Sequence, residues 1–207
     1  MHVGIIPDGT RRWARERGAS LLQAYAIGCA RGIDIVLHLC DAGVECISVF
    51  ALSNDNYKKR PSEEIEAVIL QLTESMAIAA PKLLAGEIRI RFVGDIDRLL
   101  PEHRYKLRNI EAAVSGIRNA RAEMNVLLNY SMGWDFSGPL EKHETQNIRD
   151  CDIIFRSGGV KRLSGFLPKQ SAYAELFFTT KLWPDVTKAE LDYVVKEFCK
   201  VNRSFGA

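Results

Sequence analysis

The sequence predicts an α/β domain in which a mostly parallel central sheet is flanked by helices. Short apolar runs alternate with longer stretches of helical periodicity along the 207 residues. This repeated strand–helix–strand order favours parallel strands that are joined by helical crossovers. Neither an internal repeat nor a low-complexity segment divides the chain, and its length suits one domain. We therefore expect a single domain over residues 1–207.

The first half of the chain supplies two of the expected strands and three helices. Gly43 favours the end of a helix, Ser62 is a good N-cap, and Pro81 predicts a kink or break. The expected elements are a strand at residues 3–6, a short helix from residue 10, a helix at 21–42, a strand at 46–52, a polar loop at 53–61 and a helix from 62 towards 84.

The second half continues the alternation. The expected elements are a strand at 88–93, an amphipathic helix at 101–120, a strand at 124–129, strands that begin near Asp152 and Glu175, and a helix at 187–199 capped by Thr187. This order completes the α/β pattern.

Composition excludes several functional classes. The net charge of +2 is too small to predict a nucleic-acid surface, and the basic residues act through local clusters. No apolar run predicts a transmembrane segment, and the first residues lack a signal-peptide pattern. The five cysteines include no CxxC pair, which argues against a disulfide framework and a zinc ribbon. These features favour a cytoplasmic protein.

The first candidate site is the segment from His2 to Gly18, HVGIIPDGTRRWARERG. A buried strand ends at an acidic-glycine turn that leads into a basic helix. Free N–H groups at a helix start attract phosphate, Arg11 and Arg12 add positive charge, and Asp8 suits a Mg²⁺ that bridges to phosphate oxygens. The residues thus favour a diphosphate site, although an ordinary strand-turn-helix with a solvated basic face also fits them.

The second candidate site is FRSGGVKRLSGFLPKQSAYAELFF, from Phe155 to Phe178. A strand leads into a glycine turn that we expect to expose its amides. Arg156, Arg162 and Ser164 beside this turn predict a second anion cradle. Glu175 opens the next apolar strand, where a carboxylate also suits a purely structural role. Ligands of parallel sheets bind outside the carboxyl ends of strands, so Asp8, the 53–61 loop and Arg156 are expected to share one site.

Several motifs together resemble the cis-prenyltransferases, the undecaprenyl diphosphate synthase-like enzymes, along the whole chain. They are PDG-x-RRWA, FALSNDNY, RIRFVGD, NVLLNY, the RSGG block, LWPD and a closing RSFG at 203–206. The resemblance implies the cis-prenyltransferase fold, a homodimer, Mg²⁺ as cofactor and isoprenyl diphosphates as substrates. It also implies an apolar tunnel between sheet and helices.

The resemblance further implies roles for single residues. Asp8 would bind Mg²⁺ and the allylic diphosphate, and Glu175 would help to place the metal or order the second site across a dimer. Ser53 and Asn56 would lie beside the reacting carbons, and Arg60 or Lys59 would take the place of the family's loop arginine. The other substrate-binding residues would be Gly9, Thr10, Arg11, Arg12, Trp13, Leu21 and Tyr25 for the first diphosphate and Arg156, Arg162 and Ser164 for the second.

The chain departs from the chain-elongating pattern of the family. Leu21 stands where an arginine is usual, and Tyr25 stands where a histidine is usual. Other departures are Thr10 for asparagine, Arg11 for glycine, Tyr57 for tryptophan, Val160 for glutamate, and a shorter stretch between Trp134 and Asp152. Loss of a cationic donor weakens or redirects the grip on the first diphosphate.

These departures look like the irregular branch of the family, whose members make lavandulyl-type, head-to-middle products, sometimes cyclised. We therefore predict irregular coupling of isoprenyl diphosphates. The alternatives are regular cis elongation with isopentenyl diphosphate, a noncatalytic partner subunit, and a terpene cyclase on the same fold. Asp8, Arg156 and Arg162 argue against the partner subunit, and the two anion cradles argue against the cyclase.

Overall fold

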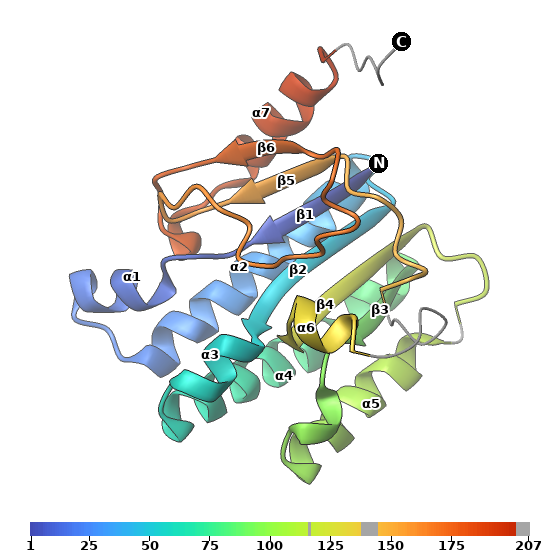
Figure 1. Cartoon of the computed structure of the whole chain (residues 1–207). Coiled ribbons are helices and arrows are strands. Elements are labelled where there is room, and N and C mark those ends of the chain that lie inside the picture. The colour runs from blue at the N-terminus through green and yellow to red at the C-terminus, as the bar shows by residue number, and fades with distance from the viewer. Residues whose placement is uncertain (116, 138–144, 202–207) are drawn as a thin grey trace.

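The protein is a layered α/β structure built on one six-stranded sheet (Figure 1). We describe it from a computed structural model, which covers residues 1–115, 117–137 and 145–201. The strands lie in the order β3-β4-β2-β1-β5-β6, and every neighbouring pair is parallel. The strands are β1 (His2–Ile6), β2 (Cys46–Ser53), β3 (Ile88–Val93), β4 (Ala122–Tyr130), β5 (Ile153–Arg156) and β6 (Glu175–Phe178). The predicted fold class is confirmed.

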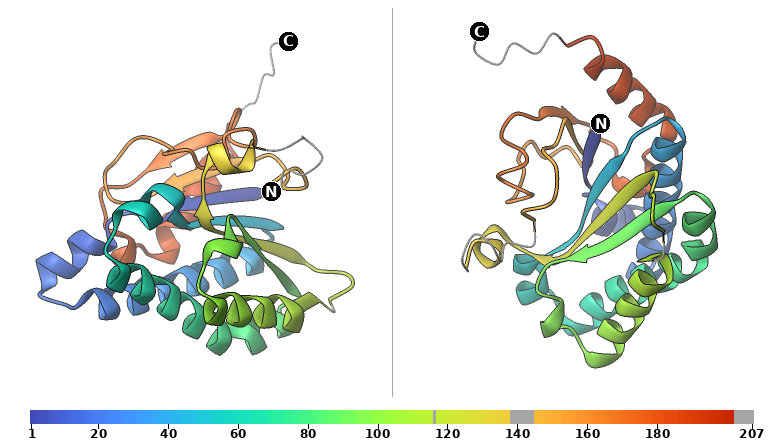
Figure 2. Two further views of the ribbon diagram at one scale, coloured as in Figure 1. Left: turned by 60° about the horizontal axis from the view of Figure 1, so that its bottom comes forward. Right: turned by 90° about the vertical axis from the view of Figure 1, so that its right-hand side faces the viewer.

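The long helices run along one face of the sheet (Figure 2). The connection from β5 to β6 and the short helix α6 lie on the other face. The helices are α1 (Thr10–Arg17), α2 (Leu21–Asp41), α3 (Asn54–Lys59), α4 (Ser62–Ala85), α5 (Pro101–Ser115), α6 (Met132–Asp135) and α7 (Lys188–Phe198). A 3₁₀ turn at Trp183–Asp185 precedes α7.

The alternation of side chains along each strand builds two cores. Ile5 belongs to the large cluster between sheet and helices, and its neighbour Ile6 belongs to a smaller cluster on the opposite face. Leu127 and Leu128 of β4 divide in the same way. Successive residues of a strand point to opposite faces, so a fully apolar strand serves two layers. The near-continuous apolar sequences of β1 and β4 follow from this double burial.

Several elements differ from the predictions. Residues 54–59 of the predicted polar loop form α3, because Ser53 caps it by accepting a hydrogen bond from the Asn56 amide at 3.1 Å. The helix α4 continues through Pro81, and the burial of Ala79 and Leu83 on either side holds it against the core. The helix predicted to reach residue 120 is described as Pro101–Ser115, and residues 117–120 are not helical.

The helix α4 is the one described helix that is long and apolar enough, by length and composition alone, to cross a membrane. Buried residues form 39% of its apolar window, and Ile65, Ile69 and Leu83 pack into the large core. A core helix passes the same test, so this helix is weak evidence for a membrane span.

Two features of the sequence lie wholly or partly outside the described residues. Residues 138–144 belong to the shortened stretch between Trp134 and Asp152, and residues 203–206 carry the closing RSFG.

The buried histidine of β1 should make the stability of the protein depend on pH. Burial lowers the pKa of His2 below its ordinary value of 6.5, although a hydrogen bond with the Arg149 carbonyl at 2.8 Å opposes the shift. The unfolded chain therefore takes up this proton at a higher pH than the folded one. Stability should fall as pH drops below about 6.5, until the folded state is protonated as well.

We expect the His2→Gln variant to lose less stability than the unaltered protein between about pH 7.5 and about pH 5.5. Urea unfolding at the two pH values measures this difference. An equal loss in the two proteins would contradict the role of His2.

Candidate functional site: a cavity at the carboxyl ends of the strands

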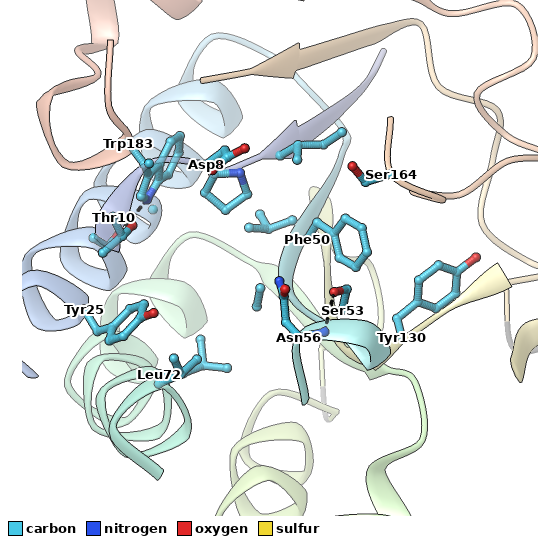
Figure 3. Close-up of a pocket in the computed structure, with 18 of the residues that line it drawn as sticks. Asp8, Thr10, Tyr25, Phe50, Ser53, Asn56, Leu72, Tyr130, Ser164 and Trp183 are labelled. Atoms are coloured by element: carbon cyan, nitrogen blue, oxygen red, sulfur yellow. Dashed lines mark hydrogen bonds between the residues drawn. The ribbon is translucent and has the colours of Figure 1, made fainter. Parts of the chain in front are cut away.

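One large cavity opens where β1, β2, β4 and β5 end (Figure 3). Its volume is about 1210 Å³, which exceeds the usual range for small-ligand pockets. Asp8, Ser53 and Arg156 come from three different strand ends and all line it. The prediction that one site collects these residues is confirmed.

Asp8 and Arg156 form the charged centre of this cavity. Arg156 Nη2 donates to Asp8 Oδ2 at 2.7 Å. The Arg156 side chain is only 5% exposed, whereas that of Asp8 is 33% exposed. Arg156 Nη1 donates to Ser164 Oγ at 2.9 Å and to the Arg162 carbonyl. Arg156 thus ties the loop after β1 to the loop after β5.

The same two loops are also joined by hydrogen bonds between side chains and backbone groups. The Ser157 hydroxyl accepts from the Asp8 amide at 2.9 Å and donates to the Asp8 carbonyl at 2.8 Å. Arg12 Nη2 donates to the Gly158 carbonyl at 2.7 Å. A Cβ on Gly158 would lie 3.0 Å from the carbonyl group of Asp8, and φ there is +83°. The close approach of the loops therefore requires glycine at this position.

The glycine turn does not expose its amides as predicted. The Gly158 amide donates to the Lys181 carbonyl at 2.7 Å, and the Gly159 amide donates to the Thr179 carbonyl at 2.8 Å. The turn uses these donors to dock against the chain that follows β6. Any anion cradle here depends instead on the side chains of Arg156, Arg162 and Ser164, which all line the cavity.

Ser164 occupies a strained position in this cradle. Its φ is +54°, a left-handed conformation that residues other than glycine seldom adopt. Its hydroxyl accepts from Arg156, which helps to hold the strained turn. Strain of this kind gathers at functional sites.

The first turn of α1 forms another part of the wall. Gly9, Thr10, Arg11 and Arg12 line the cavity, and no side chain caps the start of the helix. The first amides of a helix lack intrahelical partners, so this end suits an anion. Trp13, which was predicted to bind substrate, is not among the residues that line this cavity. Its Nε1 donates to Asp185 Oδ1 at 2.9 Å and so anchors α1 to the 3₁₀ turn.

Leu21 and Tyr25 of α2 both line the cavity. The Tyr25 hydroxyl donates to Glu64 Oε1 at 2.8 Å and accepts from Arg60 Nη1 at 3.0 Å. Burial and the contact with Glu64 raise the pKa of Tyr25, so its hydroxyl stays protonated. Tyr25 is a hydrogen-bond donor in this site and not a base.

Lys59 and Arg60, the two candidates for the loop arginine, have different surroundings. Arg60 is 19% exposed and joins Tyr25 and Glu64, whereas Lys59 is 76% exposed and pairs with Asp55 at 3.5 Å. Both side chains line the cavity. The sequence analysis did not identify Glu64, whose side chain is buried and pairs with Arg60. The signal in the sequence was its position four residues after Arg60, a spacing at which side chains of opposite charge can pair.

Ser53 and Asn56 are brought together at the end of β2. The Ser53 hydroxyl caps α3 through the Asn56 amide, and both residues line the cavity. Beyond them the wall becomes apolar. The apolar lining comes from α2, β2, α4 and β4 and includes Cys29, Ile33, Val49, Val68, Leu72, Met76, Met124 and Val126. Burial raises the pKa of Cys29 to about 12, which leaves it a neutral wall residue.

Glu175 does not join Asp8 within one chain. It stands at the amino end of β6, opposite Ile153 in register, whereas Arg156 is opposite Phe178. It is absent from the cavity lining. The described residues hold no group of three His, Cys, Asp or Glu side chains that suits a metal. A metal role for Glu175 beside Asp8 is thus not supported within the described part of one chain.

Asp8 alone still fits Mg²⁺ in the presence of a diphosphate. Mg²⁺ commonly binds one or two carboxylates together with substrate phosphates and water. Asp8 Oδ2 is paired with Arg156, while its other oxygen, Oδ1, lies 3.6 Å from Arg12, beyond hydrogen-bond distance. Among the described residues, that oxygen forms only this longer ion pair with Arg12, and its side chain is one-third exposed at the cavity wall. A single carboxylate beside several arginines suits a metal that arrives with a phosphate ligand.

A comparison with protein families identifies the family of this chain. The family described as "Putative undecaprenyl diphosphate synthase" matches residues 6–143 and 138–206. The chain belongs to this prenyltransferase family.

Named relatives of this prenyltransferase match it along nearly all its length. The ditrans,polycis-undecaprenyl-diphosphate synthase ((2E,6E)-farnesyl-diphosphate specific) of Pseudomonas aeruginosa is 34% identical, covering 99% of this chain and 90% of the relative. An isoprenyl transferase of Chlorobaculum tepidum is 31% identical, covering 99% and 85%. The alignment with the first spans 232 positions against 207 residues here, so the relative carries additional residues. The two parts of the family match overlap at residues 138–143, within the shortened stretch.

A solved structure shares the fold of this prenyltransferase. The lavandulyl diphosphate synthase from Lavandula x intermedia, in complex with dimethylallyl diphosphate, superimposes with a TM-score of 0.89. The match covers 100% of this chain and 98% of that one at 23% identity. At this identity the likeness establishes the common fold.

The close approach of Gly158 to Asp8 gives a test of the site's construction. We expect Gly158→Ala to lower the free energy of unfolding by more than about 2 kcal/mol, because left-handed strain and a backbone clash act together. Urea denaturation measures the change.

Gly18→Ala is the matched control. Gly18 also has positive φ, +61°, but nothing lies within 4 Å of its added Cβ. Gly18→Ala should lower the free energy of unfolding only through left-handed backbone strain, by about 1 to 2 kcal/mol. Equal losses in the two variants would contradict the tight docking of the loops.

Proposed function

We propose that this prenyltransferase couples two isoprenyl diphosphates by an irregular, head-to-middle reaction, with dimethylallyl diphosphate as donor. One observation carries the proposal. A single cavity joins the Asp8–Arg156 charged centre to the apolar wall of α2, α4 and β4. A diphosphate head and a hydrocarbon tail need these two environments side by side.

In the proposed reaction, the C1–O bond of the allylic diphosphate breaks and its electron pair leaves with the diphosphate. Arg11 and Arg12, together with the uncapped amides of α1, stabilise the negative charge that develops on the leaving group. Mg²⁺ bound at Asp8 would supply further positive charge to the diphosphate oxygens. The apolar wall keeps water from the allylic cation.

The second substrate captures this cation. Arg156, Arg162 and Ser164 would hold its diphosphate, while Ser53 and Asn56 would border the reacting carbons. In head-to-middle coupling, C1 of the donor bonds to C2 of a second allylic chain and leaves a tertiary cation at C3. A proton is then lost from a carbon next to that cation. The released diphosphate can accept this proton. Tyr25 is unsuited to be the base, because its raised pKa keeps the hydroxyl protonated.

The α2 wall supports irregular rather than regular coupling. Its six lining residues carry no positive charge, because Leu21 and Tyr25 occupy the positions nearest the start of α2. The first diphosphate would depend on α1 and Arg60 for its cationic contacts. A donor held from a different side would present C1 to a different carbon of its partner.

Regular cis elongation with isopentenyl diphosphate is the second candidate. The named relatives from Pseudomonas aeruginosa and Sulfolobus acidocaldarius are undecaprenyl-diphosphate synthases, at 34% and 28% identity. The long apolar lining also suits a growing chain. In this reaction C1 would bond to the terminal alkene carbon of isopentenyl diphosphate, and a proton would leave C2.

We further propose a homodimer that functions in the cytoplasm. The strand β6 is an edge of the sheet, and Leu176 on it and Tyr173 just before it are exposed. An apolar edge strand favours pairing with a second chain. Glu175 lies in this region, so any part that it plays in a site would be across such a dimer.

The test of the proposed function is a product assay with Mg²⁺. The purified protein receives dimethylallyl diphosphate alone, then with isopentenyl diphosphate, then longer allylic diphosphates with isopentenyl diphosphate. The dephosphorylated products are identified by mass and fragmentation. We expect a branched or cyclic alcohol from dimethylallyl diphosphate alone. Linear products that require isopentenyl diphosphate would establish regular elongation, and the absence of product would favour a partner subunit or a cyclase.

Removal of the Asp8 charge should stop catalysis without unfolding the protein. We expect Asp8→Asn to lower kcat by at least about 100-fold, because transition-state charge stabilisation is lost at the diphosphate. Asp97→Asn removes an exposed carboxylate outside the cavity and should retain full turnover. Steady-state kinetics and circular dichroism measure turnover and folding. Unchanged turnover of Asp8→Asn would refute the assignment of this site.

The α2 wall should control the type of product. We expect the double variant Leu21→Arg with Tyr25→His to shift products towards linear cis chains or to lower turnover, because a cation would hold the first diphosphate from α2. Leu22→Arg adds the same charge one residue away, on an exposed position outside the lining, and should leave the products unchanged. If the double variant makes the same products at the same rate, these positions do not govern regiochemistry.

A further inference from the structure

Glu64 is a buried carboxylate behind the cavity wall. Its side chain is 4% exposed, and the residue does not line the cavity. A carboxylate buried to this degree needs charged or hydrogen-bonding partners. The three partners of Glu64 all line the cavity and come from three different segments of the chain.

All three partners converge on one oxygen atom. Glu64 Oε1 accepts from the Tyr25 hydroxyl of α2 at 2.8 Å, and it lies 3.2 Å from Arg60 Nη1 and 3.4 Å from Arg11 Nε of α1. Figure 3 shows the Tyr25 hydroxyl directed inward, on the opposite side of the cavity from Ser164. One buried negative charge thus fixes a tyrosine and two arginines along a single wall.

We propose that Glu64 is a positioning residue that aims Arg60 at the diphosphate of the first substrate. The inference rests on the proposed function, because it assigns a further residue to the same site. The α2 residues of the lining carry no cation, so this wall depends on the arginines that Glu64 holds.

The bonding of Arg60 leaves donors for a ligand. Only Nη1 of Arg60 contacts the Tyr25–Glu64 pair, and the buried Nε has no hydrogen-bond partner among the described residues. Nη2 likewise has no partner in the described part of the chain. A guanidinium held at Nη1 keeps its orientation, so Nη2 can donate to a phosphate oxygen in the cavity that Arg60 lines.

Glu64 can affect diphosphate binding in two opposite ways. If Glu64 positions Arg60, its loss weakens diphosphate binding because the guanidinium loses its orientation. If Glu64 only neutralises positive charge, its loss strengthens diphosphate binding. Glu64→Gln separates the two effects, since it removes the charge and keeps the size of the side chain.

The experiment is a calorimetric titration with inorganic diphosphate and Mg²⁺. We expect Glu64→Gln to weaken diphosphate binding by about 10-fold, as loss of a charge-assisted positioning contact does. Glu63→Gln is the matched control, because it changes the exposed neighbouring carboxylate in the same first turn of α4. It should bind within about 2-fold of the unaltered protein. Thermal unfolding of each variant reports whether the fold is retained.

A double variant tests whether Glu64 acts through Arg60. If it does, Glu64→Gln combined with Arg60→Gln should bind diphosphate no more weakly than Arg60→Gln alone. Losses that add up, or tighter binding by Glu64→Gln, would overturn the proposal. If the unaltered protein binds no diphosphate, the proposed function fails and the inference fails with it. If the unaltered protein binds and Glu64→Gln binds equally well, only the positioning role fails.

Discussion

The ion pair between Asp8 and Arg156 is the interaction on which the rest of the site depends. Arg156 is almost wholly buried at the end of β5, and a buried guanidinium needs an anionic partner. Asp8 supplies it from the end of β1, the neighbouring strand in the sheet. Ser157 and the close approach at Gly158 hold the two loops in contact. The charged centre of the cavity is therefore a consequence of strand order, because β1 and β5 are adjacent.

The cavity separates two kinds of chemistry across a short distance. Charged and hydroxyl groups gather at the strand ends, where loops have freedom to present them. The apolar lining comes from the same strands and helices that form the large core, and Leu72 and Met76 belong both to the cavity wall and to the core cluster. A prenyl diphosphate has the same division between head and tail. This correspondence underlies the proposed function.

The positive charge around this cavity is unevenly distributed. The wall from α2 presents Leu21 and Tyr25, and its cationic contacts come from Arg11 and Arg60 on neighbouring segments. Glu64 binds both arginines through one buried oxygen. Electrostatic stabilisation depends on where donors point as much as on their number. A change in the direction of approach at the first diphosphate is thus a physical route to a different product.

The sequence by itself determined the order of the elements, the parallel sheet and the collection of Asp8, Ser53 and Arg156 at one edge. These features follow from local periodicity and from the rule that parallel strands end together. Only the tertiary structure decided that residues 54–59 form a helix and that the Gly158 amide bonds to the chain after β6. It also decided that Trp13 anchors α1 to the 3₁₀ turn and that Glu175 lies at the other end of the sheet from Asp8 within one chain. Finally, it decided that Arg60, and not Lys59, bonds to Tyr25. Each of these depends on partners far away in the chain. Residue types and spacing predict which groups carry charge, but the packing of distant segments decides which of them meet.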